Sequence, residues 1–319
     1  MQGCVHRLGG EVLGLWCRSV LVLVRELWGL DPNAVGRIVG LDSKRAAGHL
    51  VTRSVVGSPR DLSVLRSLAW ARYLSTTQIE RLHFPSRRTT QRRLRALRTH
   101  GLVRDHRQGV ALHLDHVHAL TQDGVARLAE AGTANARSGR VARLPKLSHG
   151  LAVRDLFVGF ALAEQLGSFE LRDFRFEEDL AGEPMFREAR LIPDALAIVR
   201  RQGVTLLVGC EVDLGTETTT TLRAKLTAWR GLMGSRSHRD FSLLTAVARA
   251  ERRRTLERLL AEVGCEGVVV ELGGLAAAPV ATLSCLFAAP VRAERTGAEE
   301  KAEEFQPVGT TPPPASRGW

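Results

Sequence analysis

The sequence is poor in cysteine, and the few cysteines are scattered. They lie at positions Cys4, Cys17, Cys210, Cys265 and Cys285. Their number is odd and no two have the C-x-x-C spacing, so neither a disulfide framework nor a zinc ribbon is favoured. We therefore expect a reduced compartment, and we predict that the protein is cytoplasmic.

Long apolar runs are also scarce. The most apolar stretch, residues 12–24, is interrupted by Arg18 and preceded by Glu11, and no small-residue cleavage site follows it. A secretory signal peptide has an apolar core followed by a small-residue cleavage site, and this stretch does not fit that pattern. It predicts instead an amphipathic helix over residues 11–29. Nothing later is long and apolar enough to span a bilayer, and we expect no membrane association.

Acidic residues are outnumbered by basic ones. The chain has 45 Lys and Arg against 34 Asp and Glu, a net charge of +11 and a pI of about 10.5, with arginine dominant. A strongly basic soluble protein is attracted to nucleic acid first and to anionic membranes second. The alternative explanation of the positive charge is a high-GC genome, which enriches arginine throughout the sequence. Local clustering of the arginines would favour nucleic-acid binding over this explanation.

The length of 319 residues and the 44% apolar content predict two compact domains and a tail. Residues 1–60 form a helical segment in this scheme. Within it, residues 34–50 have helix-turn-helix spacing, with Gly40 ending one helix and Asp42 capping the next. DNA contact by this segment and a simple packing hairpin are equally compatible with that spacing.

Residues 61–131 predict a winged helix-turn-helix domain. Ser75 and Gln78 form a capping box that starts its second helix. An arginine-rich helix follows over residues 87–100, with Leu94 and Leu97 facing inward, and Gly101 ends it. Residues 102–104 and 110–114 predict the two strands of a wing, and residues 121–131 predict a closing helix.

The arginine-rich helix is the strongest functional signal in the sequence. Guanidinium groups neutralise phosphates and read guanine edges in the major groove, so the helix is expected to bind double-stranded DNA. A solvated charged face is the alternative, but hardly any acidic residue lies between positions 81 and 104 to balance it. The predicted DNA-binding side chains are Arg87, Arg88, Gln91, Arg92, Arg93, Arg95, Arg98, Arg104 and Arg107.

A basic linker over residues 132–146 leads to a second domain over residues 147–290, and a Pro-rich disordered tail is predicted over residues 291–319. The second domain predicts an αβββαβ order with additions, so the overall fold class is α+β to α/β with a mixed sheet. The helices are predicted over residues 148–166, 217–233 and 249–263, and the strands over 169–176, 190–199, 204–213, 241–247 and 267–271.

Acidic residues gather along two of these strands. Glu211 and Asp213 share one face of their strand, since side chains alternate with period two. If Asp194 ends the preceding strand beside them, three carboxylates converge on a site that suits Mg²⁺. Asp194, Glu211, Asp213 and Lys225 are therefore candidate catalytic residues, and Asp194 and Glu211 are candidate metal ligands.

Histidines supply weaker signals. His113, His116 and His118 lie close to Asp115, but their spacing matches no common zinc pattern, and exposed imidazoles on a wing are the simpler interpretation. His149 begins the second domain's first helix, where a capping or packing role is favoured over a catalytic one.

Several segments follow one another in a demanding order along the chain: residues 72–79, the arginine-rich helix, 101–103, 120–124, 149–155, 193–194, 211–217, Leu222 and Lys225. In this order the chain resembles the replication-relaxation family of plasmids and integrative elements. The resemblance covers roughly residues 61–235. It implies a protein of a mobile element's replication or transfer apparatus that acts on plasmid DNA, with other replication or mobilisation proteins as candidate partners.

The second domain separately resembles the PD-(D/E)XK nuclease superfamily. In that comparison Asp194 and Glu211 would hold the metal. The chain departs from the pattern at Asp213, where the superfamily has lysine, and Lys225 on the following helix is the candidate replacement. Three functions stay open: a DNA-binding protein with a nuclease-like scaffold, a Mg²⁺-dependent endonuclease, and a transcriptional regulator that needs only the N-terminal half.

Overall fold

The computed structural model of the chain describes residues 57–106, 115–133, 136–139, 141, 144–234 and 241–287. All of its helices and strands belong to the compact unit that begins at Pro59. The predicted helix over 11–29, the hairpin over 34–50, the strand over 110–114 with the neighbouring Arg107, and the tail over 291–319 lie outside the described residues.

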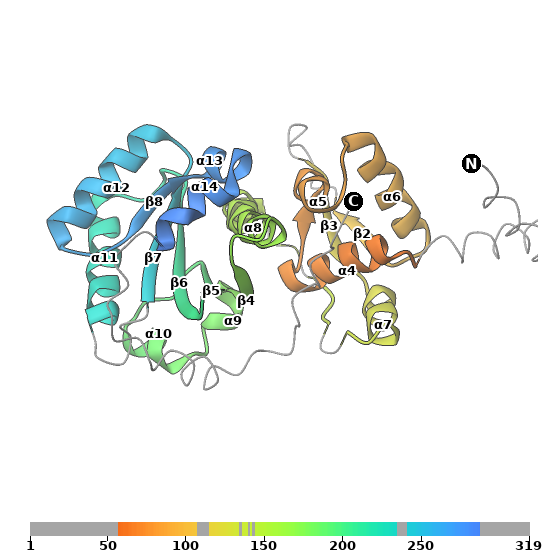
Figure 1. The fold of residues 1–319 in the computed structure, drawn as a ribbon, viewed down its shortest axis with the longest axis horizontal. Coiled ribbons are helices and arrows are strands. Elements are labelled where there is room, and N and C mark those ends of the chain that lie inside the picture. The colour runs from red at the N-terminus through yellow and green to blue at the C-terminus, as the bar shows by residue number, and fades with distance from the viewer. Residues whose placement is uncertain are drawn as a thin grey trace, which may run out of the picture. The chain divides into compact units, whose positions relative to one another are not determined.

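The first half of this unit consists of four helices and a three-stranded antiparallel sheet with strand order β1-β3-β2 (Figure 1). β2 and β3 form a hairpin whose register pairs Val103 with Leu120. The elements are α4 (Pro59–Ala71), β1 (Leu74–Ser75), α5 (Thr76–His83), α6 (Arg87–Thr99), β2 (Val103–His106), β3 (Val117–Leu120) and α7 (Gln122–Glu130).

Local sequence signals explain where these helices begin and end. The capping box of α5 is present: the Gln78 backbone N–H donates to the Ser75 hydroxyl, and the Ser75 N–H donates to the Gln78 side chain. Leu94 and Leu97 of α6 are buried, as their helical spacing predicts. Gly101 follows α6 with a φ of 71°, a left-handed conformation that favours glycine.

The second half is built on a five-stranded mixed sheet with strand order β4-β5-β6-β7-β8. β5 is antiparallel to both of its neighbours, β4 and β6, whereas β6, β7 and β8 run parallel. Its strands are β4 (Glu170–Phe176), β5 (Ala195–Arg201), β6 (Val204–Asp213), β7 (Phe241–Val247) and β8 (Val268–Glu271). Its main helices are α8 (Leu144–Gln165), α11 (Thr219–Gly234) and α12 (Ala250–Val263).

Helices cover this sheet on two sides (Figure 1). α11 and α12 pack against one face through a core that includes Leu226, Trp229 and Leu256. α8 packs against β4 and β6, and two short helices, α13 (Leu272–Ala277) and α14 (Pro279–Leu283), contact it. The residues of β6 after Val204 are all buried, which is typical of a strand covered on both faces.

In the second half the order of the main elements agrees with the sequence prediction, but several details of the fold differ. In the first half β2 pairs with β3 (Val117–Leu120), a strand that was not predicted. The predicted strand over 190–199 begins only at Ala195, and Pro193, which has no N–H to donate to a strand partner, precedes it. Two short helices that were not predicted, α9 (Glu177–Leu180) and α10 (Pro184–Glu188), occupy the segment between β4 and β5. Asp194 therefore precedes its strand and does not end it.

Buried contacts join the two halves. The Trp70 indole N–H at the end of α4 donates to the Phe174 carbonyl of β4 over 2.8 Å. The Arg154 guanidinium of α8 lies 4.1 Å from the ring centre of Tyr73 and 4.2 Å from that of Phe176. Cation–π contacts of this kind gain strength when they are desolvated, and Arg154 is buried. Among the helices that the structure describes, none is long and apolar enough to cross a membrane.

Candidate nucleic-acid interface and metal centre

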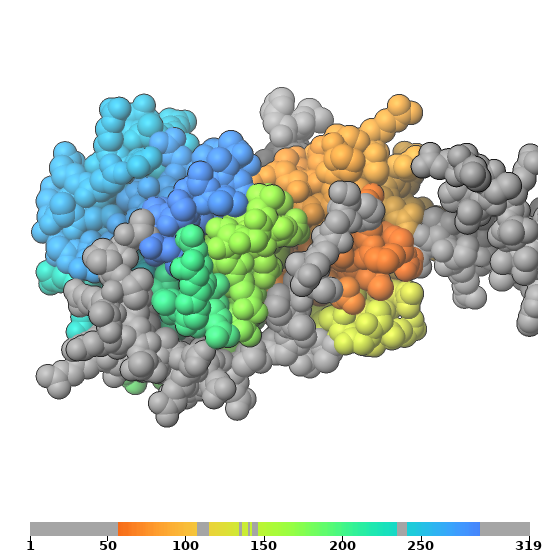
Figure 2. Space-filling model, in the orientation of Figure 1, coloured from red at the N-terminus to blue at the C-terminus, as the bar shows by residue number. Residues whose placement is uncertain are grey.

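One face of α6 presents basic side chains to solvent. Arg88, Gln91, Arg92 and Arg95 are exposed, and their spacing of three and four residues places them in one stripe on the helix. The atoms of this light-orange segment reach the molecular surface in Figure 2. No acidic partner is found for Arg88, Arg92 or Arg95 within the described part of the chain.

Two other arginines of α6 make ion pairs within their own half of the protein. Arg87 pairs with Asp115. Arg93 pairs with the buried Asp61 of α4. The sequence shows few acids near α6, but the fold brings them there from other elements, so these arginines are partly engaged in holding α6 in place.

The arginine near the end of α6 and the arginine in the first strand of the wing also have partners within the protein. Arg98 pairs with Asp105 of β2. Arg104 donates to the Gly139 carbonyl of the linker segment. The side chains that remain free for DNA are therefore a subset of those predicted.

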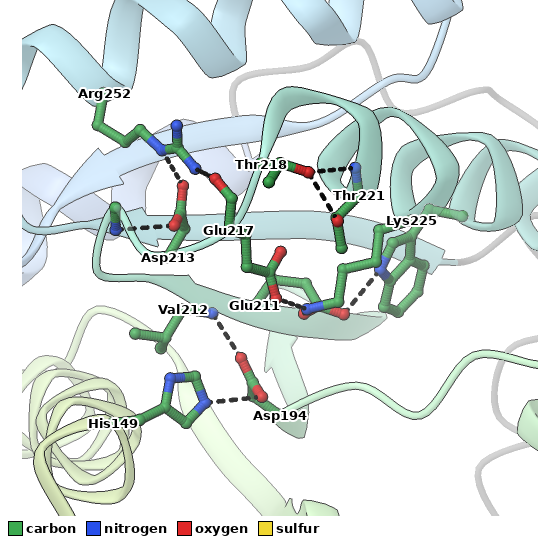
Figure 3. A network of polar contacts seen from close by, with 12 residues as sticks. His149, Asp194, Glu211, Val212, Asp213, Glu217, Thr218, Thr221, Lys225 and Arg252 are labelled. Atoms are coloured by element: carbon green, nitrogen blue, oxygen red, sulfur yellow. Dashed lines mark hydrogen bonds and ion pairs between the residues drawn. The ribbon is translucent and has the colours of Figure 1, made fainter. Parts of the chain in front are cut away.

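The second candidate site lies where β5 and β6 meet. The antiparallel register pairs Ala195 with Cys210, so one step outward along the two strands Asp194 lies opposite Glu211. The Asp194 carboxylate accepts the Val212 backbone N–H over 2.7 Å (Figure 3). The two predicted metal ligands are thus brought together at one edge of the sheet.

Glu211 is buried between two side chains of α11. Its Oε2 accepts from Lys225 Nζ over 2.8 Å, and its Oε1 accepts from the Trp229 indole N–H over 3.0 Å. Lys225 also donates to Glu217 over 3.2 Å. Burial, aided by the nearby charge of Asp194, raises the pKa of Glu211 to about 7, although Lys225 opposes the shift.

Lys225 keeps its proton. Burial by itself lowers the pKa of Lys225, but the carboxylates of Glu211, Asp194 and Glu217 more than offset that effect and raise it above its usual range. The raised pKa of Lys225 depends partly on the negative charge of Glu211, because a neutral Glu211 would attract the lysine less. The lysine stays protonated whether Glu211 is charged or neutral.

Asp194 also contacts a histidine from the other side of the sheet. His149 Nε2 of α8 lies 3.0 Å from Asp194 Oδ1 (Figure 3). The hydrogen bond to Asp194 raises the pKa of His149, and partial burial opposes the shift. The sequence prediction of a capping or packing role for His149 did not include this contact.

Asp213 does not join the other two carboxylates. It forms an ion pair with Arg252 of α12, and its Oδ1 accepts the Gly215 backbone N–H over 2.8 Å (Figure 3). Arg252 also donates to the Glu217 carbonyl over 2.6 Å. The predicted convergence of three carboxylates is therefore reduced to two, because Arg252 from a distant helix engages the third.

The histidines of the β2–β3 hairpin make separate contacts. His118 Nε2 lies 2.9 Å from the Thr76 hydroxyl, and His116 Nδ1 lies 3.3 Å from Asp105. His113 lies outside the described residues. Across the described ranges no group of three or more His, Cys, Asp or Glu side chains is arranged to hold a metal ion.

A family model described as replication-relaxation matches residues 65–247, which is more than half of the chain. The chain belongs to the replication-relaxation family. The match includes α5, α6 and the Asp194–Glu211–Lys225 site. None of the curated proteins matches this family member.

Two solved structures of the restriction endonuclease FokI share partial similarity with this replication-relaxation protein. The DNA-bound structure matches 72% of this chain and 45% of FokI at 11% identity, with a TM-score of 0.28. The second structure matches 67% of this chain and 41% of FokI at 11% identity, with a TM-score of 0.29. The chain thus spans less than half the length of FokI.

The donor chemistry of the site in this replication-relaxation protein fits a divalent cation. Asp194 and Glu211 supply adjacent carboxylates, and Mg²⁺ in proteins often binds one or two carboxylates while keeping several waters. Glu217 Oε2, beside Lys225, is buried without a hydrogen-bond partner among the described residues. Both oxygens of each carboxylate already accept a hydrogen bond, so a cation would have to displace one donor from each.

Trp229 was not identified from the sequence, and for His149 the sequence favoured a capping or packing role. Their contacts to Asp194 and Glu211 come from helices 45 and 18 residues away along the chain. No spacing rule links residues so far apart. Only the structure shows that Gly209, two residues before Glu211 on β6, makes room for the Trp229 ring, since a Cβ there would approach the ring to 2.0 Å.

Proposed function

We propose that this replication-relaxation protein binds duplex DNA through the exposed face of α6. The observation that carries the proposal is the stripe formed by Arg88, Arg92 and Arg95, which face solvent while Leu94 and Leu97 are buried on the opposite side. A helix of this kind enters the major groove in helix-turn-helix proteins, with the preceding helix crossing the backbone. The arrangement of α4, α5 and α6 with the β2–β3 hairpin supports a winged helix-turn-helix.

The stripe provides both kinds of contact that DNA recognition uses. Guanidinium groups bind phosphates, and they also form paired hydrogen bonds with guanine, whereas glutamine pairs with adenine. Gln91 lies beside Arg92 in the stripe and is exposed. The face is therefore suited to reading bases as well as to binding the backbone.

The test replaces Arg92 and Arg95 together with alanine and measures DNA binding across a salt series. Loss of two phosphate contacts should reduce the slope of log K against log salt by about two, and binding should weaken accordingly. The matched control is Arg254→Ala with Arg258→Ala, which removes two exposed arginines from α12 and changes the net charge equally. Equal effects of the two double variants would show that α6 has no special role.

Arg93 is left intact in this experiment, because removing one partner of its ion pair with the buried Asp61 would destabilise the fold. An effect of Arg92 and Arg95 alone can then be assigned to DNA contact.

The DNA concerned is proposed to be that of a plasmid or other mobile element, where the protein acts in replication or mobilisation with other proteins of that apparatus. Family membership supports this role. A transcriptional regulator would need only the DNA-binding half. Mapping bound sites on a plasmid that carries the gene separates the two: binding at the replication or transfer origin supports the proposal, and binding only at promoters contradicts it.

A second function, Mg²⁺-dependent cleavage of DNA, is favoured by one specific observation. Lys225 Nζ lies 2.8 Å from Glu211, so a lysine from α11 reaches the site even though Asp213 stands where a lysine is expected in PD-(D/E)XK nucleases. A bound Mg²⁺ supplies Lewis-acid polarisation of a phosphodiester oxygen and activation of water. Asp194 and Glu211 are the residues that would hold it.

The protein's own groups define what each could contribute to cleavage. Lys225 carries a positive charge, so it is suited to neutralising a phosphate and not to accepting a proton. His149 and Trp229 orient the two carboxylates. Glu217 is a second carboxylate that accepts a hydrogen bond from Lys225, over 3.2 Å.

The cleavage test incubates the protein with supercoiled plasmid in Mg²⁺, in Mn²⁺ and in chelator. Metal-dependent nicking should be lost in Asp194→Ala and in Lys225→Met, and should persist in the control Glu188→Ala, an exposed acid on α10. DNA binding by all three variants checks their folding. Retardation of the plasmid without nicking by the wild type would reject the enzyme function and leave the DNA-binding function standing.

A further inference from the structure

Glu211 is held by two donors of different kinds. Lys225 is charged, half-buried and long, and its side chain keeps 29% of its exposure. Trp229 is fully buried and its indole cannot turn without disturbing the core between α11 and the sheet. Oε2 of Glu211 thus has a donor that can be displaced, Lys225, and Oε1 has a donor that is fixed in the core, Trp229.

The fold makes specific room for the fixed donor. Gly209 lies directly under the indole, where a methyl group would come to 2.0 Å from Trp229 Cη2. The indole N–H is buried, and a buried donor that lacks an acceptor costs free energy, so it pairs with Glu211 Oε1 at 3.0 Å. This contact orients the carboxylate with Oε2 toward Lys225.

The Asp194 carboxylate also has one fixed donor and one displaceable donor. Its Oδ2 accepts the Val212 backbone N–H, which the β6 strand fixes, and its Oδ1 faces His149, a side chain that is 39% exposed. The fixed donors hold Glu211 Oε1 and Asp194 Oδ2. The displaceable donors contact the remaining two oxygens, Glu211 Oε2 and Asp194 Oδ1, so these are the oxygens that a cation could take over by displacing a donor.

We propose that Trp229 is a positioning residue whose indole N–H fixes Glu211 so that Oε2 is presented to a divalent cation. The inference rests on the metal-dependent function proposed above and goes beyond it in assigning this buried tryptophan to the site. Residues that hydrogen-bond to metal ligands orient them, and their loss typically costs about 10- to 100-fold in metal affinity.

The experiment measures Mn²⁺ affinity of the full chain by calorimetry for the wild type and Trp229→Phe. The variant keeps an aromatic ring in the core and loses only the donor and part of the volume. We expect binding at least about tenfold weaker. Asp194→Ala, which should abolish the binding, verifies that the measured heat comes from this site.

Trp70→Phe is the matched control. It also removes a buried indole N–H, whose acceptor is the Phe174 carbonyl away from the acidic residues, and it should leave Mn²⁺ affinity unchanged. Thermal unfolding of both variants checks that each is folded. A purely structural role of Trp229 would lower the stability of Trp229→Phe without changing its metal affinity, and that result overturns the proposal.

A measurement on the wild type keeps the proposal testable if Trp229→Phe does not fold. The indole N–H signal of Trp229 is assigned in ¹⁵N-labelled protein by elimination, using single Trp→Phe variants at Trp16, Trp28, Trp70 and Trp319. Addition of Mg²⁺ should shift this signal, and a constant signal under saturating Mg²⁺ overturns the proposal. If the wild type binds no divalent cation, both this inference and the metal-dependent function are wrong.

Discussion

Glu211 is a carboxyl group whose burial makes stability depend on pH. Its pKa rises from 4.5 to about 7 in the folded protein, chiefly through desolvation. The folded state therefore binds this proton more tightly than the unfolded chain does. The stabilisation is complete below about pH 4.5 and is lost as the pH rises through 7, a change on the order of 3 kcal/mol.

We predict that Glu211→Gln removes this dependence. In chelator, the unfolding free energy of the wild type relative to the variant should fall between pH 4.5 and 7.5, as measured by urea denaturation. Glu130→Gln, which changes a carboxyl with 68% side-chain exposure, serves as the control and should give a constant difference. A constant difference for Glu211→Gln as well would mean that Glu211 titrates normally.

Arg92 and Arg93 are neighbours in the sequence with opposite roles. Arg93 pairs with Asp61, whose side chain is 1% exposed, whereas Arg92 is exposed. Removing one partner of a buried ion pair typically costs about 3 kcal/mol, and an exposed substitution costs less than about 0.5 kcal/mol. We predict that Arg93→Met lowers the unfolding free energy, with no such loss in Arg92→Met.

For the salt dependence of DNA binding we expect the opposite order of effects from these two substitutions. Arg92→Met should reduce the salt slope, and Arg93→Met should leave it unchanged, when both are measured well below their melting temperatures. Similar stability losses in the two variants would contradict the assignment of Arg93 to the fold.

At the scale of elements, α8 approaches the DNA-binding half very closely at Gly150. A Cβ at this position would lie 2.1 Å from the Tyr73 hydroxyl oxygen and 3.4 Å from the Cζ that carries it. Tyr73 is buried beside Arg154 and has little freedom to move away. The clash therefore depends almost entirely on one oxygen atom.

We predict that Gly150→Ala destabilises the protein by about 1 to 3 kcal/mol, the usual cost of overpacking. In the Tyr73→Phe background the oxygen is gone, and the same substitution should cost nothing or even stabilise the chain, because alanine is favoured over glycine within a helix by about 1 kcal/mol. Urea denaturation of the four proteins in this double-mutant cycle measures the difference. Additive effects would show that the close approach does not limit α8.

For the whole molecule, the buried contacts between the halves predict joint unfolding. The Arg154 guanidinium between Tyr73 and Phe176 and the Trp70–Phe174 hydrogen bond belong to both cores. We expect one thermal transition in which far-ultraviolet circular dichroism and tryptophan fluorescence coincide. Arg154→Ala should lower the midpoint or split it in two, whereas Arg172→Ala, an exposed arginine of β4, should do neither. Two separate transitions in the wild type would mean that the halves fold independently.

Local signals in the sequence were enough to place most of the elements. β6 and β7 have the predicted bounds, and α6 begins at the predicted residue and ends one residue early. Such elements depend on interactions between residues close in the chain: apolar periodicity, the Ser75–Gln78 capping box and the stop at Gly101. The approach of Asp194 to Glu211 was expected only if Asp194 ended its strand; it precedes β5 instead, and the register of the β5–β6 hairpin places it opposite Glu211.

The tertiary structure decided which arginines and carboxylates form ion pairs within the protein and which face solvent. The sequence determined that α6 is arginine-rich and that two strands carry acids. Only the fold brings Asp61 to Arg93, Arg252 to Asp213, and His149 and Trp229 to the carboxylates. Ion pairs and hydrogen bonds act over a few ångströms in space, whereas sequence patterns report only neighbours along the chain, so these partners become known once the helices are packed.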